Sequence, residues 1–146
     1  MKVYIAHKIS GARMEATVNW FHETFIRLSL MGFEALSPMA NKEELRIERP
    51  YESHGYTELP QVTDHAIFER DRWMVTQCDI LFLDLSDTEK VSIGCMMELA
   101  WASLLGKHTV VVLPKDNVHT HAFVLEGADV IFETYDEAMV YMKKLF

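Results

Sequence analysis

The chain has 146 residues, of which 49% are hydrophobic and 25% are charged, a composition typical of a globular protein with one hydrophobic core. Its formal net charge is −8, from 22 acidic and 14 basic residues, so a nucleic-acid backbone or an anionic membrane surface would on balance be repelled. We therefore expect one domain over residues 1–146, with a small molecule or another protein as its partner and with no nucleic acid and no membrane.

The amino-terminal residues and the two cysteines bear on the compartment. Residues 1–6 enter a strand-like run directly and lack the long apolar core and the small-residue cleavage site of a signal peptide. No apolar run approaches the length that spans a bilayer. Cys78 and Cys95 have neither metal-ligand spacing nor the pattern of a disulfide framework, so we expect two reduced, semi-buried thiols. These features predict a cytoplasmic protein.

Strand-like and helix-like patterns alternate from the start of the chain. Residues 3–6 form a short apolar run that ends in a polar loop containing Gly11, which predicts a strand and a turn. Apolar side chains then recur every three or four positions over residues 14–31, and Gly32 follows where a helix would end. Residues 33–36 predict a second strand.

The periodicity is lost between residues 41 and 63. This segment is charged and contains Pro50 and Pro60, and long irregular segments of compact domains are commonly functional or mobile. Two interpretations stay open for it: an active-site flap, or a surface insertion without a role. A helix is expected to resume near Asp64.

The second half of the chain repeats the alternation. Residues 80–85 are almost continuously apolar, as in a central strand that is buried on both faces. A polar loop and a helix that ends at residues 105–106 follow. Residues 109–113 predict another buried strand, and residues 130–132 a weaker one. Asp136 is expected to be the N-cap of a closing helix.

This order of elements predicts an α/β fold. Short connections between alternating strands and helices indicate a flavodoxin-like (Rossmann-like) doubly wound fold, a five-stranded parallel sheet with helices on both faces. The loops after the first, third and fourth strands would then meet at one edge of the sheet. We expect residues 4–13, 84–98 and 117–121 to approach a common crevice there.

Several kinds of site are disfavoured by their missing motifs. The sequence contains neither GxGxxG nor GxxxxGK[ST], so it predicts no dinucleotide fingerprint and no Walker loop. Ser92 lies in no G-x-S-x-G elbow, and nothing pairs Cys95 with a histidine, which disfavours serine and thiol hydrolases. His119 and His121 lack an HExxH motif or an acidic cluster beside them, so contact with a ligand or a subunit is favoured over a metal. We expect no metal and no cofactor.

Carboxylate chemistry is what remains for the crevice. Glu98 is expected in the first turn of the helix that follows residues 80–85, where the helix start aims side chains into the crevice. Asp71 lies on the preceding predicted helix and could reach the same edge. Two carboxyl groups in different environments can divide glycosidic cleavage, because one attacks the anomeric carbon while the other protonates the leaving group. The alternative is that both are solvated surface carboxylates.

Four stretches of sequence stand in a characteristic order and spacing. They are KVYIA at residues 2–6, ERD with CDI at residues 69–80, VSIG with ELAWA at residues 91–102, and GK at residues 106–107. Together they resemble the nucleoside 2-deoxyribosyltransferase family over most of the chain. The resemblance implies that Glu98 attacks C1′ of the sugar and holds a covalent deoxyribosyl intermediate. It also implies that Asp71 exchanges a proton with the base and that Tyr4, at the end of the first strand, orients Glu98.

The same resemblance implies partners and further contacts. The substrates would be small 2′-deoxynucleosides or deoxynucleotides and free nucleobases. The protein would form a dimer-based homo-oligomer in which a neighbouring subunit completes the active site, with the loop at residues 117–121 in that region. The residues expected to bind substrate are His7, Gly11, Arg13, Asp84, Ser92, Gly94, Asn117 and His121.

Ser92 departs from the pattern of the well-known transferases. They carry an acidic residue six positions before the nucleophile, where this chain has a serine. A serine here resembles the related 2′-deoxynucleoside 5′-monophosphate N-glycosidases, in which it contacts the 5′-phosphate. The stretch SGAR at residues 10–13 partly resembles their phosphate loop. A transferase is therefore the first prediction, a monophosphate hydrolase the alternative, and a nucleotide-binding sensor without turnover an alternative of another class.

Overall fold

The computed structural model describes residues 1–12, 14–40, 52–57 and 59–145. The elements are β1 (Lys2–His7), α1 (Met14–Leu30), β2 (Glu34–Leu36), the 3-10 turn η2 (Pro60–Val62), α2 (Asp64–Gln77), β3 (Ile80–Asp84), α3 (Ile93–Leu104), β4 (His108–Val112), α4 (Ala122–Gly127), β5 (Val130–Phe132) and α5 (Tyr135–Lys143). Within these described ranges, no helix has both the length and the apolar character to cross a bilayer.

The strands form one parallel sheet in the order β2-β1-β3-β4-β5. The predicted flavodoxin-like order is therefore confirmed, and the expected strands and long helices differ from the observed ones only by a residue or two at their ends. β3 lies in the middle, and every one of its five residues is buried. Its almost continuous apolar run reflects this position, because helices cover both faces of a central parallel strand.

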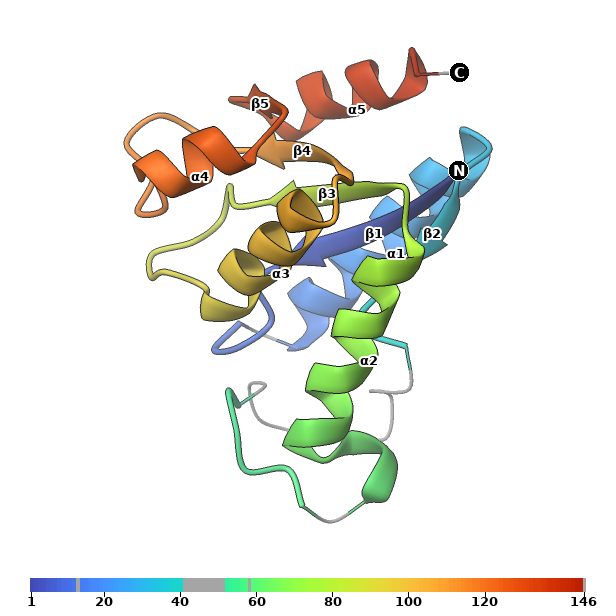
Figure 1. Ribbon diagram of the computed structural model, residues 1–146, viewed down its shortest axis with the longest axis vertical. Helices are drawn as coiled ribbons and strands as arrows, with labels where there is room; N and C mark the ends of the chain where they lie inside the picture. The colour runs from blue at the N-terminus through green and yellow to red at the C-terminus, as the bar shows by residue number, and fades with distance from the viewer. Residues whose placement is uncertain (13, 41–51, 58, 146) are drawn as a thin grey trace.

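Two hydrophobic cores lie on opposite faces of the sheet. In Figure 1, α2 and α3 lie in front of the sheet and α1 lies behind it. The front core joins side chains of α2, α3 and α4 to the sheet, and the rear core joins those of α1 and α5. Since successive side chains of a strand point to opposite faces, Tyr4 enters the front core while its neighbours Val3 and Ile5 enter the rear one.

The helix starts explain two corrections. The N-cap of α5 is Thr134, not Asp136, because Thr134 and Glu137 form a reciprocal capping box. Asp136 instead lies in the first turn, where its negative charge interacts favourably with the helix dipole. Ser92 is the N-cap of α3, so Glu98 is the sixth residue of that helix and lies in its second turn rather than its first.

The helix α4 was not predicted, because six residues are too few to show a helical period. Of the irregular segment at residues 41–63, residues 41–51 and 58 lie outside the described part of the chain. In the described part, the Asp64 carboxylate accepts hydrogen bonds from the backbone N–H groups of Gly55 and Tyr56, at 2.8 and 3.1 Å. These two donors lower the pKa of Asp64 and attach the segment to the start of α2. A flap function for the segment stays a prediction.

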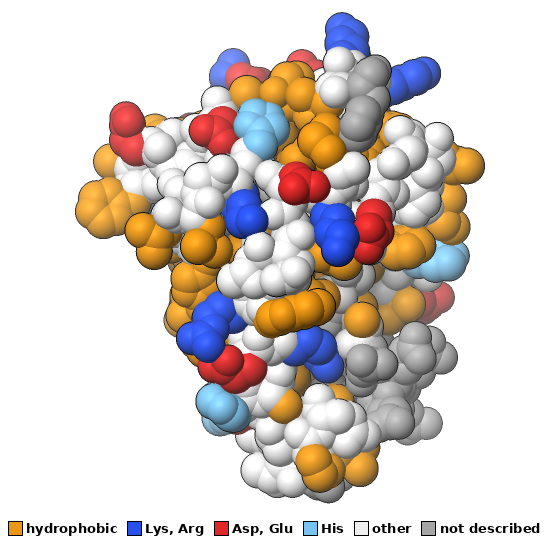
Figure 2. Space-filling model, turned by 45° about the vertical axis from the view of Figure 1, so that its right-hand side comes forward, with side chains coloured by type: hydrophobic (Ala, Val, Ile, Leu, Met, Phe, Trp, Pro, Cys, Tyr) orange, Lys and Arg blue, Asp and Glu red, His pale blue; other side chains and the backbone are white. Residues whose placement is uncertain are grey.

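The surface carries both charge signs close together. On the face that Figure 2 presents, described lysine and arginine side chains lie beside aspartates and glutamates. Arg72 and Glu69 of α2 form an exposed ion pair, with 2.6 Å between Nη2 and Oε2.

Candidate functional site

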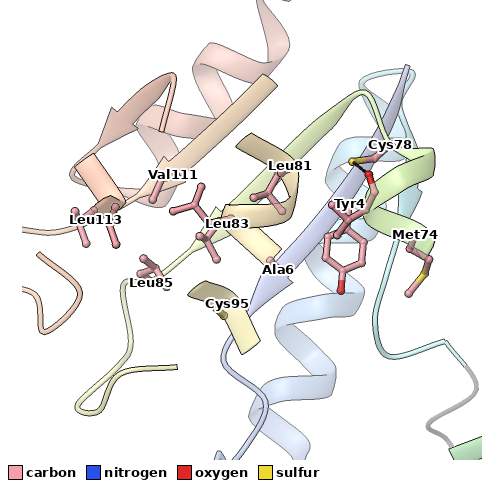
Figure 3. Close-up of a cluster of buried hydrophobic side chains, with 14 residues drawn as sticks. Tyr4, Ala6, Met74, Cys78, Leu81, Leu83, Leu85, Cys95, Val111 and Leu113 are labelled. Atoms are coloured by element: carbon pink, nitrogen blue, oxygen red, sulfur yellow. Dashed lines mark hydrogen bonds between the residues drawn. The ribbon is translucent and has the colours of Figure 1, made fainter. Parts of the chain in front are cut away.

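Tyr4 and Glu98 form a buried hydrogen bond beneath the front helices. The Tyr4 hydroxyl donates to Glu98 Oε1 at 2.7 Å, and the two residues are 0% and 9% exposed. Tyr4 lies in the middle of β1 rather than at its end, because the strand continues to His7. Figure 3 shows its ring between β1 and α2, close to Met74 and Cys78. The position of the Glu98 carboxylate is thus set by the second turn of α3, which carries it, and by the Tyr4 hydroxyl of β1, which donates to it.

Asp71 belongs to the same group of side chains. It lies on α2, three residues before the buried Met74, so both occupy the helix face that meets the sheet. Its side chain is 14% exposed, and its Oδ1 is 3.8 Å from Arg70 Nε. Burial raises the pKa of Tyr4 well above its usual value, and the negative charges of Glu98 and then Asp71 add to this rise. The charges of both carboxylates thus act on one phenol, which stays protonated and donates to Glu98.

Ser92 and Gly94 lie at the start of α3. The Ser92 hydroxyl caps the helix by accepting from the Cys95 N–H at 3.5 Å.

The loop after β1 contains two further predicted substrate contacts. Gly11 has a φ of +74°, which favours glycine in the turn after β1. Arg13 lies outside the described residues. Residues of both loops, of the start of α3 and of the irregular segment line a cavity of about 460 Å³: Lys8, Ser10, Ser53, Lys90, Val91, Ser92, Ile93 and Gly94. The predicted meeting of the loops after β1 and β3 is confirmed.

His7 and Asp84 lie on the other side of the sheet from Tyr4 and Glu98. The two pair in register, and His7 Nδ1 is 2.9 Å from the Asp84 backbone oxygen. Trp20 of α1 stacks on the His7 ring at 4.2 Å and donates its Nε1–H to Asp84 Oδ2 at 3.0 Å. These two predicted substrate contacts are therefore engaged with each other and with Trp20, a residue that sequence reasoning assigned no part in the site.

The loop after β4 is joined to the loop after β3. Asn117 Nδ2 donates to the Leu85 backbone oxygen at 2.7 Å, and Asn117 Oδ1 accepts from the His119 N–H at 2.9 Å. The Asn117 amide is thus used within its own chain. His121 is exposed and caps α4 by accepting from the Phe123 N–H at 3.2 Å. Among the described residues, no group of three or more His, Cys, Asp or Glu side chains could hold a metal ion.

The two cysteines are buried and free. Burial raises the pKa of the Cys95 thiol far above its usual value, and the charge of Glu98 adds to this rise. Burial also raises the pKa of the Cys78 thiol. Because the thiolate is the nucleophilic form, neither cysteine is suited to nucleophilic catalysis. The Glu98 carboxylate, by contrast, is held in place by the Tyr4 hydroxyl at 2.7 Å.

Solved structures of known function share this fold. A 2-deoxyribosyltransferase from Bacillus psychrosaccharolyticus aligns with a TM-score of 0.68 at 17% identity, over 95% of this chain and 90% of that one. A 2-deoxyribosyltransferase from Leishmania mexicana aligns with a TM-score of 0.66 at 18% identity, over 98% and 97%. The Clostridium botulinum CMP N-glycosidase aligns with a TM-score of 0.61 at 14% identity, over the full length of both chains. Identities this low show the fold alone.

The family is shown by sequence. No curated protein matched the chain in a direct comparison. The sequence model of the family described as nucleoside 2-deoxyribosyltransferase, however, matches residues 3–141, a span that includes Tyr4, Asp71 and Glu98. Members of this family transfer glycosyl groups or cleave glycosidic bonds. The matched span and the shared fold lead to one conclusion: the chain belongs to the nucleoside 2-deoxyribosyltransferase family.

Proposed function

We propose that this protein is a nucleoside 2-deoxyribosyltransferase, which cleaves the N-glycosidic bond of a 2′-deoxynucleoside and transfers the sugar to another nucleobase or to water. The observation that carries the proposal is the buried 2.7 Å hydrogen bond from Tyr4 to Glu98, and the negative charge of Asp71 acts on the same phenol. A carboxylate held in one orientation by a rigid donor is what nucleophilic attack on a sugar carbon requires.

In the first step, Glu98 is the nucleophile. One of its carboxylate oxygens forms a bond to C1′ while the bond from C1′ to the base nitrogen breaks, and the electron pair of that bond leaves with the base. The product is an ester between the sugar and Glu98. The Tyr4 phenol, whose raised pKa keeps it protonated, orients the carboxylate throughout.

Asp71 serves the leaving base. A base departs more easily when a proton neutralises the charge that develops on it, and Asp71 of α2 is the second carboxylate whose charge acts on Tyr4. In the second step, an acceptor base attacks C1′ and displaces Glu98, while Asp71 removes the proton that the new base must lose. Two inversions at one carbon give net retention.

The acceptor decides between transfer and hydrolysis. A base bound beside the sugar ester yields a new nucleoside, whereas water yields free deoxyribose. Family membership and the likeness to both deoxyribosyltransferases and an N-glycosidase support the shared first step.

A 2′-deoxynucleoside 5′-monophosphate hydrolase is the second candidate, and the 460 Å³ cavity favours it. Two lysines, Lys8 and Lys90, line this cavity together with Ser92 in a protein whose net charge is −8. Cationic side chains beside a helix start suit a phosphate group. In this candidate the monophosphate is preferred and water is the acceptor.

We also propose that the protein acts in the cytoplasm as a homo-oligomer, with residues 1–146 forming one domain. The outer face of α3 and α4 supports self-association. It holds a largely apolar cavity of about 750 Å³, and Leu104 and Phe123 on its rim are each 84% exposed. A neighbouring subunit on this face would lie next to the loop at residues 118–121, which lines the same cavity.

One incubation tests the proposal. Purified protein is mixed with 2′-deoxyinosine or its 5′-monophosphate, with and without adenine, and the products are separated by chromatography. Exchange of hypoxanthine for adenine supports the transferase, and free hypoxanthine with deoxyribose supports the hydrolase. Glu98→Ala should abolish either reaction. Substrate binding without base release by the wild-type protein would contradict both candidates and favour the sensor.

A further inference from the structure

His119 occupies the junction between the loops after β3 and β4. Its side chain is almost completely buried, at 2% exposed. Nε2 lies 2.8 Å from the Ser92 backbone nitrogen, and Nδ1 lies 2.9 Å from Asn117 Oδ1 and 3.3 Å from Thr88 Oγ1. The ring therefore bridges the N-cap of α3 and the loop that leads to α4.

The neighbours of the ring determine its protonation. A backbone N–H can only donate, so the Ser92 N–H requires an unprotonated Nε2 as its acceptor. The Asn117 and Thr88 side chains donate to the Leu85 backbone oxygen, through Nδ2 at 2.7 Å and Oγ1 at 2.8 Å. Their oxygens that face Nδ1 are left to accept, which requires a proton on Nδ1. The pattern is satisfied by the neutral ring with its proton on Nδ1 and by no other state.

Ser92 is the residue that this arrangement fixes. It caps α3, lines the 460 Å³ cavity and precedes Glu98 by six positions. We propose that neutral His119 is a positioning residue, which holds Ser92 and the start of α3 in the geometry needed for substrate, and that protonation of its ring releases them. This inference rests on the proposed function for its catalytic consequence, but the hydrogen-bond arrangement stands without it.

Protonation of His119 would break its hydrogen bond with the Ser92 N–H at Nε2. A proton on Nε2 would place a second donor against the Ser92 N–H, and two facing donors repel. Burial, and then the positive charge of Lys8 from the loop after β1, lower the pKa of His119. His121 and Glu126 border the same α3/α4 cavity as His119. The ring is thus kept neutral near neutral pH and becomes charged only in more acidic solution.

Nitrogen NMR of the wild-type protein tests the arrangement without any assay of activity. Spectra that correlate the ring protons with both ring nitrogens should show His119 with its proton on Nδ1 at neutral pH and a pKa below that of a free histidine. The Ser92 amide signal should titrate together with the ring. A proton on Nε2 at neutral pH, or a Ser92 amide that ignores the titration, would overturn the proposal.

Two variants test the consequence for catalysis. His119→Gln keeps an acceptor near the position of Nε2, whereas His119→Phe keeps a ring of similar size but leaves the part-buried Ser92 N–H without its acceptor in the ring. We expect His119→Phe to lower kcat by roughly three- to tenfold, the change in rate that corresponds to the loss of one ordinary hydrogen bond, and His119→Gln to restore most of it. In the wild-type protein, protonation of the His119 imidazole should lower kcat as the solution becomes acidic. Because glutamine does not titrate, this part of the decrease should be absent from His119→Gln. His65→Gln, which removes an exposed histidine of α2, is the control and should keep the wild-type pH profile.

The outcomes separate the two claims. If the wild-type protein releases no base from any deoxynucleoside or deoxynucleotide, the proposed function fails, and the NMR experiment still decides the state of His119. If the wild-type protein is active and folded His119→Phe matches it in kcat and in pH profile, the positioning role is refuted. The positioning role would also be refuted if the Gln and Phe variants lost equal amounts of kcat and the Gln variant kept the wild-type decrease of kcat in acidic solution.

Discussion

Removing one oxygen atom tests how Glu98 is held. In Tyr4→Phe the aromatic ring stays in the front core, but Glu98 Oε1 loses the donor that now lies 2.7 Å away. Tyr4 is 0% exposed, so bulk water has no direct access to replace that donor. The substitution therefore removes a buried hydrogen bond to a charged group and little else.

The size of the effect follows from the type of bond. A hydrogen bond to a charged group contributes about 1.5–3 kcal/mol. Since about 1.4 kcal/mol corresponds to a tenfold change in rate, Tyr4→Phe should lower kcat by roughly ten- to 150-fold. The loss should appear in kcat more than in KM, because the phenol orients the nucleophile and does not bind the base.

The assay is the initial rate of hypoxanthine release from 2′-deoxyinosine, measured over a range of substrate concentrations. Tyr135→Phe is the matched control, because it also removes a hydroxyl, one that shares a 3.0 Å hydrogen bond with Thr24 in the rear core. That control should keep the wild-type kcat. A folded Tyr4→Phe protein with kcat within about twofold of wild type would refute the orienting role of the phenol.

Three further predictions concern other parts of the molecule. Asp71→Asn should lower kcat by roughly 10²–10⁴-fold with little change in ligand affinity, which rate and binding measurements would show, and unchanged kcat would remove Asp71 from the mechanism. Thr134→Ala breaks the capping box of α5 and should lower the free energy of unfolding in urea by about 0.5–2 kcal/mol without altering activity. Because the pKa of folded His119 lies below its unfolded value, the unfolded chain binds more protons in mild acid. The free energy of unfolding should therefore fall as the pH decreases from about 6.5 to the folded pKa, and His119→Gln should show a smaller fall in urea titrations.

The fold could be predicted from sequence because its signals are local and repeated. The apolar run of β3 and the three- and four-residue periods of α1 reflect burial that acts along the whole element. The six residues of α4 carry too little of such a signal. The N-cap of α5 could have been found, since Thr134 with Glu137 three residues later is the capping-box pattern.

The site was predictable only in part. Tyr4 and Glu98 are 94 positions apart, so their hydrogen bond depends on how the strands pair and how α3 packs on the sheet. No local sequence pattern encodes either of these. The separation of Tyr4 from His7, by contrast, was available from the sequence. Residues three apart on one strand point to opposite faces, which places His7 toward Trp20 and away from Glu98. The role of His119 was not predictable, because the partners of its ring come from two loops, and those in the loop after β3 lie far from it in the sequence.

The central claim is that Glu98 forms a covalent bond to the sugar. Wild-type protein can be mixed with 2′-deoxyinosine in the absence of an acceptor base, quenched rapidly in acid, and its intact mass and peptides measured. We predict a protein species heavier by one deoxyribosyl group, attached to the peptide that contains Glu98 and absent from Glu98→Ala. Base release at the wild-type rate by Glu98→Ala, or a sugar attached to another residue, would contradict the account.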